Sequence, residues 1–458
     1  MTSTLRRVLV ANRGEIAVRI VRACRDEGLE VVVAVSDADQ DSLASRLADA
    51  VVHIGPPSAA QSYLRVGQIV CAALLARCDA VHPGYGFLSE QPALAEACAA
   101  NDLVFVGPSA NVIRRGGDKV AARAAARRAG VPVGAGSDTV DSVDAAVAIA
   151  GSIGFPVLLK AAAGGGGRGM VRADDAGELA TRFAVASNEA RSAFGDGRLY
   201  VERFVENARH VEVQLLADTH GHIVHLGDRD CSLQRRYQKV LEEGPAAALS
   251  VELRARLAAA AVALGGELDY VGAGTVEFLV DLDRHDFVFL EVNTRIQVEH
   301  PVTEMVTGID IVREQLRIAA GSPLSFTQAD VVVTGHSIEC RINAESVGSG
   351  FLPAPGRVVR WSPPEGPGIR VDTHVFTGYD VPPYYDSLLA KLIVGGTDRD
   401  DAIRNLALAL TSFAVEGIDT TIDLHQQIVQ HPDFRADNIN TKWLENVLLR
   451  ELASTPSQ

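Results

Sequence analysis

The chain of 458 residues is long enough for roughly two to four domains and for more than one hydrophobic core. Its formal charge of -15 and pI near 5.3 argue against a nucleic acid or an acidic membrane as a partner. It has no run of eighteen apolar residues and no apolar segment near its start, so neither a membrane-spanning nor a secreted protein is expected. Six scattered cysteines without metal-ligand spacing favour reduced thiols in a cytoplasm.

The first region alternates buried strands with an amphipathic helix. Residues 8–14 are predicted to form a strand and turn, residues 15–27 a helix, and residues 30–35 and about 79–81 two more strands. This βαβ pattern predicts a parallel sheet. The segment His-Pro-Gly-Tyr-Gly-Phe-Leu-Ser-Glu (82–90) follows the third strand, where open α/β sheets bind ligands, although a Gly-Pro loop without a function is the alternative.

Two lysines in the next region stand out because only five of the 43 basic residues are lysine. A helix at about 110–130 carries Lys119, and a strand at 155–160 ends in Lys160. Four glycines (164–167) before Arg168 let backbone N–H groups approach a polyanion and let the loop move as a lid, with a flexible linker as the alternative. The chain lacks GxxxxGK[ST], and no GxGxxG follows its first strand, so a bound nucleotide needs another architecture.

Alternation continues through the middle of the chain. Strands are predicted at 200–205 and 209–214, and the second places His210, Glu212 and Gln214 on one face. The charge-dense segment 228–239 ends in Lys239; a solvated loop would explain its charges but not the choice of lysine over arginine.

An Ala-rich helix (252–265) is followed by the pattern of a hairpin, formed by strands at 274–280 and from 289. Centred on Arg284, this hairpin places Glu277 directly opposite Glu291. The carboxylates of Glu277 and Glu291 and the amide oxygen of Asn293 then converge on one face. This set of oxygen ligands suits Mg²⁺.

The second strand of the hairpin is predicted to continue through residues 289–304. Its polar side chains alternate onto one face, which carries Glu291, Asn293, Arg295, Gln297 and Glu299. Polar residues of this kind are poor strand formers, which indicates a functional face; a solvated face of an antiparallel sheet is the alternative.

The last region begins near residue 334 with another alternating strand, after a helix at about 309–320. Its many Gly and Pro residues between 350 and 383 suit short strands and turns. A pair of amphipathic helices closes the chain near residue 449.

Six motifs in this order, between about residues 5 and 448, resemble those of biotin carboxylase, an ATP-grasp ligase. They are His-Pro-Gly-Tyr-Gly-Phe-Leu-Ser-Glu, Gly-Gly-Gly-Gly-Arg-Gly-Met, Arg-Asp-Cys-Ser-Leu-Gln-Arg-Arg, Glu-Val-Asn-Thr-Arg-Ile-Gln-Val-Glu-His-Pro-Val-Thr-Glu, Glu-Cys-Arg-Ile-Asn-Ala-Glu and Pro-Pro-Tyr-Tyr-Asp-Ser. Together they are highly specific.

The resemblance implies a multidomain protein of the α/β and α+β classes. An N-terminal Rossmann-like (pre-ATP-grasp) domain is expected at 1–115, an ATP-grasp domain at 116–333 with a mobile lid at about 132–203, and a C-terminal mixed α/β domain at 334–449.

The implied activity is the carboxylation of biotin N1 by bicarbonate, driven by ATP through a carboxyphosphate intermediate. This is the first half-reaction of an acetyl-CoA or other acyl-CoA carboxylase, as in fatty acid biosynthesis. The resemblance implies ATP, two Mg²⁺ (or Mn²⁺) ions, a biotin carboxyl carrier protein, a carboxyltransferase and a homodimer in the cytoplasm. With three methionines, none in an Ala-Met-Lys-Met sequence, the chain is expected to receive biotin on a separate carrier unless it belongs to a longer protein.

The resemblance also assigns residues by motif position. Glu277, Glu291 and Asn293 would bind the metal, as the hairpin pattern also suggests. Bicarbonate would be bound by Lys239, Arg295, Gln297 and the Val298 amide, with Glu299 as the base. Arg341 would stabilise the oxygen of biotin, and Tyr85 would face that site. The nucleotide would contact Lys119, Lys160, Gly164, Gly165, Gly166, Gly167, Arg168, Gly169, Met170, Glu202, Val205, His210, Gln234, Glu277 and Glu291.

Two other readings compete with this one. A different ATP-grasp ligase is disfavoured by Arg341 together with the run Glu-His-Pro-Val-Thr-Glu, and a catalytically silent scaffold in a carboxylase complex is disfavoured because every candidate catalytic residue is present. The chain departs from the family at Tyr237, where the family often has histidine, in the segment 241–249, and at Ala163 in the lid.

Overall fold

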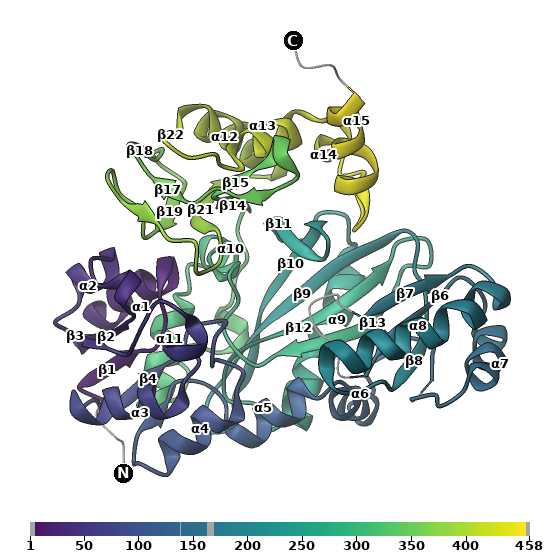
Figure 1. Ribbon diagram of the computed structural model, residues 1–458, viewed down its shortest axis with the longest axis horizontal. Coiled ribbons are helices and arrows are strands. Elements are labelled where there is room, and N and C mark those ends of the chain that lie inside the picture. The colour runs from purple at the N-terminus through teal and green to yellow at the C-terminus, as the bar shows by residue number, and fades with distance from the viewer. Residues whose placement is uncertain (1–4, 138, 163–168, 455–458) are drawn as a thin grey trace.

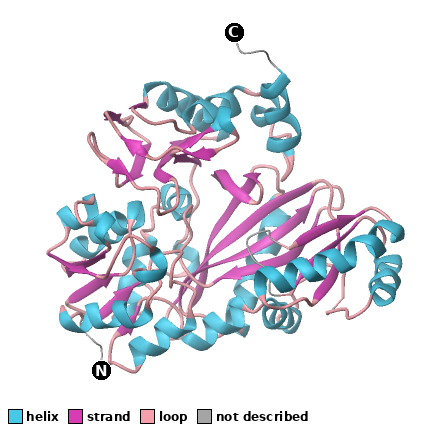
Figure 2. Cartoon of the chain, viewed as in Figure 1, coloured by secondary structure: helices cyan, strands magenta, loops and turns pink. Residues whose placement is uncertain are grey.

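A computed structural model describes residues 5–137, 139–162 and 169–454, and Figure 1 shows three lobes of the chain. Figure 2 shows that the chain contains both helices and strands. No helix within the described ranges is long and apolar enough to cross a membrane. All six cysteines are free thiols.

The N-terminal lobe contains a five-stranded parallel sheet in the order β3-β2-β1-β4-β5, so the predicted parallel sheet is confirmed. Strands β3 and β5 are not predicted from the sequence; the residues of β3 are alternately half-buried and exposed, and those of β5 are half-buried. The elements are β1 (Arg7–Val10), α1 (Gly14–Asp26), β2 (Glu30–Val35), α2 (Leu43–Leu47), β3 (Ala50–His53), α3 (Val66–Leu75), β4 (Ala80–His82), α4 (Pro92–Ala99), β5 (Val104–Phe105) and α5 (Ala110–Gly117).

The single helix expected at about 110–130 is wrong, because two helices occupy this segment. Helix α5 ends at Gly117 and α6 (Lys119–Arg128) begins two residues later. Asp118 caps the start of α6 by accepting a hydrogen bond from the Ala121 N–H at 2.8 Å. This break places Lys119 in the first turn of α6.

A small lobe extends from one end of the molecule (Figure 1). Its three-stranded sheet, in the order β7-β6-β8, is packed by α7 and α8 around its own apolar cluster. Its elements are α7 (Val143–Ile153), β6 (Val157–Ala161), β7 (Met170–Ala173), α8 (Ala176–Phe194) and β8 (Leu199–Arg203).

The centre of the molecule is an eight-stranded sheet in the order β13-β12-β9-β10-β11-β14-β21-β19. Its first five strands and the helices near them are β9 (Ala208–Ala217), β10 (Ile223–Arg235), β11 (Gln238–Gly244), α9 (Val251–Glu267), β12 (Gly272–Asp281), β13 (Asp286–Asn293), α10 (His300–Thr307) and α11 (Ile311–Ala319). The charge-dense segment 228–239 is therefore not a solvated loop: it forms most of β10 and the start of β11.

The C-terminal lobe continues the central sheet, because β14 pairs with β11. Its elements are β14 (His336–Asn343), β15 (Glu345–Ser346), β16 (Leu352–Pro353), β17 (Gly356–Arg357), β18 (Arg360–Ser362), β19 (Ile369–Thr373), β20 (Asp380–Val381), β21 (Leu388–Gly396), α12 (Arg399–Ser412), β22 (Ala414–Glu416), α13 (Ile422–Gln430), α14 (Pro432–Arg435), a π-helical turn (Leu444–Leu448) and α15 (Leu449–Ser454). The short strands between 350 and 383 are confirmed, whereas the expected closing helix pair is wrong, because more helices follow and α15 runs to residue 454.

The polar strand predicted for residues 289–304 is wrong beyond residue 293, where β13 ends. The Thr294 N–H is donated to Glu90 at 3.1 Å rather than to a neighbouring strand. Helix α10, with Pro301 in its first turn, begins at residue 300. The polar residues after Asn293 therefore lie in a connecting segment at the centre of the molecule, where the lobes meet.

Candidate active site

The backbone register lines up four charged residues across four neighbouring strands. Arg229 on β10 is opposite Glu212 on β9, Glu212 is opposite Glu277 on β12, and Glu277 is opposite Glu291 on β13. Opposed residues of antiparallel strands project to the same face of a sheet. The predicted pairing of Glu277 with Glu291 is therefore confirmed, although a bulge after Glu277 shifts the rest of the hairpin by one residue.

Lys239, on β11, neutralises part of this row. Its ammonium lies 2.7 Å from Glu212, 2.9 Å from Glu277 and 2.7 Å from Glu299. Burial alone would lower the pKa of Lys239, but the surrounding acidic groups raise it well above its ordinary value. The site therefore holds a fixed ammonium surrounded by three carboxylates.

Arg229 supplies a second buried cation. Its Nε donates to Glu212 at 2.6 Å, and the side chain has no exposed surface. Burying these carboxylates without cations would cost free energy. Arg229 and Lys239 offset that cost by pairing with the acidic row.

Glu299 connects two cations at the start of α10. Its Oε1 lies 2.7 Å from Lys239 Nζ and its Oε2 lies 2.9 Å from Arg341 on β14. Burial would raise the pKa of Glu299, but the charges of Lys239 and Arg341 lower it well below its ordinary value. Glu299 is thus a carboxylate in this arrangement, as a general base must be before it accepts a proton.

Arg341 is held on its other side by Glu242, whose Oε1 accepts from Arg341 Nε at 2.7 Å. Burial raises the pKa of Glu242 to about 7, against the opposing charge of Arg341. A small cavity opens beside Arg341 and Lys239; Arg235, Gln238, Asn343 and Phe351 also line it.

Arg295 and Gln297 join the same site from the segment after β13. Gln297 donates to Glu277 at 3.1 Å, and Arg295 donates to Gln297 and, at 3.0 Å, to Glu90. Val298 follows in the turn before α10. The predicted bicarbonate residues are thus brought together, although not by the predicted strand.

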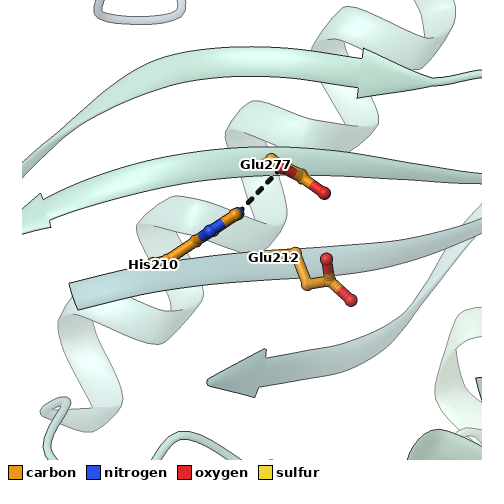
Figure 3. A group of neighbouring side chains, drawn as sticks. All are labelled: His210, Glu212 and Glu277. Carbon is orange, nitrogen blue, oxygen red and sulfur yellow. Dashed lines mark hydrogen bonds and ion pairs between the residues drawn. The ribbon is translucent and has the colours of Figure 1, made fainter. Parts of the chain in front are cut away.

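Figure 3 shows a group in the described part of the chain whose ligand atoms lie close enough to hold a metal ion: His210, Glu212 and Glu277. His210 Nε2 lies 2.8 Å from Glu277 Oε2. Of the predicted metal ligands, Glu277 belongs to this group and Glu291 stands beside it in the row. Asn293 presents its amide nitrogen to Glu277 at 2.9 Å, while its amide oxygen accepts from Arg295.

The carboxylate oxygens of Glu277 and Glu291 fit a divalent cation. The expected convergence of the Asn293 amide oxygen with them is wrong for this structure, because that oxygen is held by Arg295. Burial, and next the charge of Glu277, raise the pKa of Glu291, so two carboxylates repel each other at this point. Carboxylate oxygens are hard ligands of the kind that Mg²⁺ prefers.

The predicted nucleotide residues lie between the central sheet and the small lobe. Lys160 on β6 and Arg123 on α6 both bind the carboxylate of Glu202 on β8. Met170 is opposite Lys160 on β7, directly after Gly169. The remaining predicted lid residues, Gly164, Gly165, Gly166, Gly167 and Arg168, and the departure at Ala163, lie outside the described residues.

Other predicted nucleotide residues are spread around the acidic row. Gln234 Nε2 lies 3.5 Å from His210 Nδ1 on the neighbouring strand. The pKa of Glu291 is raised by burial and by the charge of Glu277, and the charge of Lys119 opposes that rise. Val205 lies in the connection between β8 and β9, half-buried.

The loop after β4 reaches the site through Tyr85 and through Glu90, which accepts from Arg295. The Tyr85 hydroxyl donates to Glu15 on α1, and the charge of Arg341 acts on the phenol.

Tyr237, where the family often has histidine, is 58% exposed at the turn between β10 and β11. Its ring therefore points mostly into solvent.

Several site residues escaped the sequence analysis. Glu90, Glu212, Arg229 and Glu242 received no role. Glu90, Glu212 and Glu242 directly contact the predicted residues Arg295, Lys239 and Arg341, and Arg229 contacts Glu212. The face shared by His210 and Glu212 was visible from alternation. The partners of that face were not, because they depend on the register of β10 against β9.

Three family models match most of the chain. The model described as "Biotin carboxylase, N-terminal domain" matches residues 4–113. The model described as "Carbamoyl-phosphate synthase L chain, ATP binding domain" matches residues 118–327, and that described as "Biotin carboxylase C-terminal domain" matches residues 339–446.

Characterised proteins are similar over the same length. Biotin carboxylase 1 of Bacillus subtilis is 49% identical over 442 residues, which cover 96% of this chain and 98% of that protein. The crystal structure of a biotin carboxylase complex with βγ-ATP from Campylobacter jejuni has a TM-score of 0.93 and 44% identity, covering 96% and 98% of the two chains. The biotin carboxylase domain dimer of Hydrogenobacter thermophilus 2-oxoglutarate carboxylase, solved with MgADP and bicarbonate, has a TM-score of 0.91 and 44% identity, covering 96% and 97%.

Proposed function

The chain belongs to the biotin carboxylase family, and from this premise we propose how its residues share the ATP-dependent carboxylation of biotin by bicarbonate. It is an ATP-dependent ligase that converts ATP, bicarbonate and biotin into ADP, phosphate and carboxybiotin, with Mg²⁺ as cofactor. The observation that carries the assignment of roles is the ammonium of Lys239 in contact with Glu212, Glu277 and Glu299.

Bicarbonate binds between Lys239 and Arg295, with Gln297 and the Val298 N–H as further donors. Lys239 and Arg295 are each tied to acidic groups, which fixes both cations in place before the anion arrives. Bicarbonate is a weak nucleophile, so holding it in line with the γ-phosphorus of ATP supplies much of the rate.

Glu299 is the base. At rest Lys239 and Arg341 lower its pKa, but bound bicarbonate draws part of the Lys239 charge to itself. The pKa of Glu299 then rises, and its carboxylate takes the bicarbonate proton as the bicarbonate oxygen attacks the γ-phosphorus. The P–O bond to ADP breaks, and carboxyphosphate forms.

Glu277, Glu291 and Asn293 would hold Mg²⁺ or Mn²⁺, in two ions. The repulsion between Glu277 and Glu291 supports this assignment. When bound, the metal neutralises charge on the phosphates.

ATP lies against Lys119, Lys160, His210 and Gln234, beside Gly169 and Met170. The adenine lies near Glu202 and Val205. Lys160 binds Glu202 in the described state, and the phosphates would compete for this ammonium.

Arg341 stabilises the biotin oxygen as N1 attacks the carboxyl carbon of carboxyphosphate. The C–O bond to phosphate breaks, and the released phosphate takes the N1 proton. A buried guanidinium opposite a developing oxyanion acts like an oxyanion hole, where losing one donor costs about 3 to 4 kcal/mol. The bonds from Arg341 to Glu242 and Glu299 hold it in place for this role, and Tyr85 borders the same space.

The proposal also covers the partners of the chain, its location and its domain boundaries. As a biotin carboxylase, the chain acts as the subunit or domain of a carboxylase, and we infer a biotin carboxyl carrier protein, a carboxyltransferase and a homodimer as its partners. Six free thiols are compatible with a cytoplasmic location. We also infer domain boundaries near residues 115 and 333, with a lid at about 132–203; the two boundaries fall in the gaps between the ranges that the family models match.

The experiment that tests the proposal is ADP release by the purified chain with Mg²⁺ and bicarbonate, with and without free biotin. We expect biotin to stimulate ADP release. No ADP release would favour a silent scaffold, and ADP release that neither bicarbonate nor biotin stimulates would favour a ligase that acts on another carboxylate.

A further inference from the structure

The turn Gln297–Glu299 carries two groups that the proposed function directs at bicarbonate, the Val298 N–H and the Glu299 carboxylate. It lies between the end of β13 and the start of α10 and belongs to neither element. Its orientation must therefore be set by contacts other than the strand hydrogen bonds that end at Asn293.

His300 provides the first such contact. Its side chain is fully buried, and Nδ1 lies 2.8 Å from the Gln297 carbonyl oxygen. A carbonyl oxygen can only accept, so Nδ1 carries the proton and donates. Burial, followed by the charges of Lys391 and Arg19, lowers the pKa of His300 well below its ordinary value, so the ring is neutral.

The other ring nitrogen, Nε2, is buried and makes no hydrogen bond to the described residues. It lies 4.0 Å from Glu304. The polar bond of this imidazole is thus directed at a single backbone carbonyl.

Lys391 provides the second contact. It lies on β21, directly opposite Arg341 on β14, and is fully buried. Its ammonium donates to the Val298 carbonyl at 2.9 Å and lies 3.1 Å from Glu15, which also accepts from Tyr85. Lys391 therefore links the turn to the loop that borders the biotin site.

Because peptide groups are planar, these two contacts determine the direction of the Val298 N–H and of the Glu299 backbone. The Gln297 carbonyl and the Val298 N–H belong to one trans peptide and point in opposite directions. Fixing the carbonyl on His300 therefore aims the N–H away from the imidazole. In the same way, fixing the Val298 carbonyl on Lys391 orients the next peptide and sets the backbone of Glu299.

We propose that His300 and Lys391 are positioning residues, which hold the two consecutive carbonyls of this turn so that the Val298 N–H and the Glu299 carboxylate face bicarbonate. The inference rests on the proposed function. Neither side chain touches the substrates in this scheme.

The test compares three substitutions of His300 by steady-state bicarbonate-dependent ATP cleavage. In His300→Asn the amide nitrogen can take the place of Nδ1, in His300→Gln it reaches instead toward the place of Nε2, and His300→Leu has no donor. We expect the KM for bicarbonate to rise about tenfold in the Leu and Gln variants, as for one lost buried hydrogen bond, and to stay within about threefold in the Asn variant. The KM for ATP should stay unchanged in all three.

His374→Leu is the matched control, because it removes another buried imidazole, 3% exposed, that contacts no site residue named above. It should lower the melting temperature but leave the KM for bicarbonate unchanged. Equal effects of the Asn and Leu variants, or a KM for ATP that rises with that for bicarbonate, would overturn the proposal. A wild-type chain without bicarbonate-dependent cleavage would overturn the proposed function, and this inference with it.

Lys391→Met tests the second carbonyl. It should lower kcat for bicarbonate-dependent cleavage at least about tenfold, because Glu299 loses its alignment, while nucleotide affinity measured by binding stays unchanged. If the variant is folded by its melting curve and kcat is unaltered, Lys391 has no positioning role. If it does not fold, the three His300 variants decide the proposal by themselves.

Discussion

Lys239 Nζ lies 2.7 Å from Glu299 Oε1, while the other oxygen of Glu299 lies 2.9 Å from Arg341. The proposed base is therefore clamped between the proposed anchor for bicarbonate and the proposed anchor for biotin. When a substrate binds Lys239 or Arg341, that cation interacts less strongly with Glu299. Substrate binding therefore changes the basicity of the Glu299 carboxylate.

Glu299→Gln should abolish both bicarbonate-dependent ATP cleavage and biotin carboxylation, by at least about 100-fold, because the amide cannot accept the proton. Nucleotide affinity should stay within about threefold, since Glu299 is not placed at the nucleotide. Rates and a nucleotide titration on the same preparation check this, and cleavage at more than a tenth of the wild-type rate would exclude Glu299 as the base.

Arg341→Ala should separate the two half-steps. Biotin carboxylation should be lost, whereas part of the bicarbonate-dependent ATP cleavage should remain, because Lys239 still holds Glu299. Parallel measurement of ADP release and of carboxybiotin checks the difference. An equal loss of both activities would refute the division of roles between Lys239 and Arg341.

Glu291→Gln should weaken the metal site without destroying the fold. Removing one of two repelling carboxylates relieves a like-charge contact, so the melting temperature should hold or rise in the absence of metal. The Mg²⁺ concentration for half-maximal ATP cleavage should rise at least about tenfold, and excess chelator should stop the wild-type reaction. An unchanged Mg²⁺ requirement would remove Glu291 from the ligand set. Exposed Glu365→Gln is the control and should change neither property.

Stability should depend on pH through Glu243, which is buried between His336 at 2.8 Å and Arg399 at 2.6 Å. Burial alone would raise the pKa of Glu243, but these two partners lower it from 4.5 to about 2. The folded state therefore binds this proton less tightly than the unfolded state. The stabilisation is complete above about pH 5 and is lost as pH falls toward 2, by roughly 3 kcal/mol.

Denaturant unfolding of wild type and Glu243→Gln from pH 7 to pH 3 checks this expectation. The difference in free energy of unfolding should be constant down to about pH 5 and then shrink. A difference that does not change with pH would mean that Glu243 does not hold its charge in this way. Glu365→Gln, again as the control, should track wild type at every pH.

Part of this site could be predicted from short-range patterns in the sequence, whereas most of the residue roles came from the family resemblance. The turn between Asp281 and Asp286 sets the centre of the hairpin, so Glu277 and Glu291 could be paired by counting. Alternation likewise placed His210 and Glu212 on one face of β9.

The rest could not be predicted, because it depends on contacts distant in sequence. Residues 294–299 alternate like a strand, yet Glu90, about 200 residues earlier, takes the Thr294 N–H and turns the chain away. Two other contacts also join residues that are distant in sequence. Arg123 binds Glu202 on another lobe, and Lys391 binds the Val298 carbonyl oxygen. Periodicity reports which face a side chain occupies but not which distant group meets it there.

The central claim is that one site joins ATP, bicarbonate and biotin around Lys239 and Glu299. The most direct measurement is transfer of labelled carbon from bicarbonate to free biotin by the purified chain with ATP and Mg²⁺. We expect label in biotin in proportion to ADP formed above the biotin-free rate, and none with Glu299→Gln. Labelled biotin formed equally well by Glu299→Gln, or ADP formed without any label in biotin, would contradict the account.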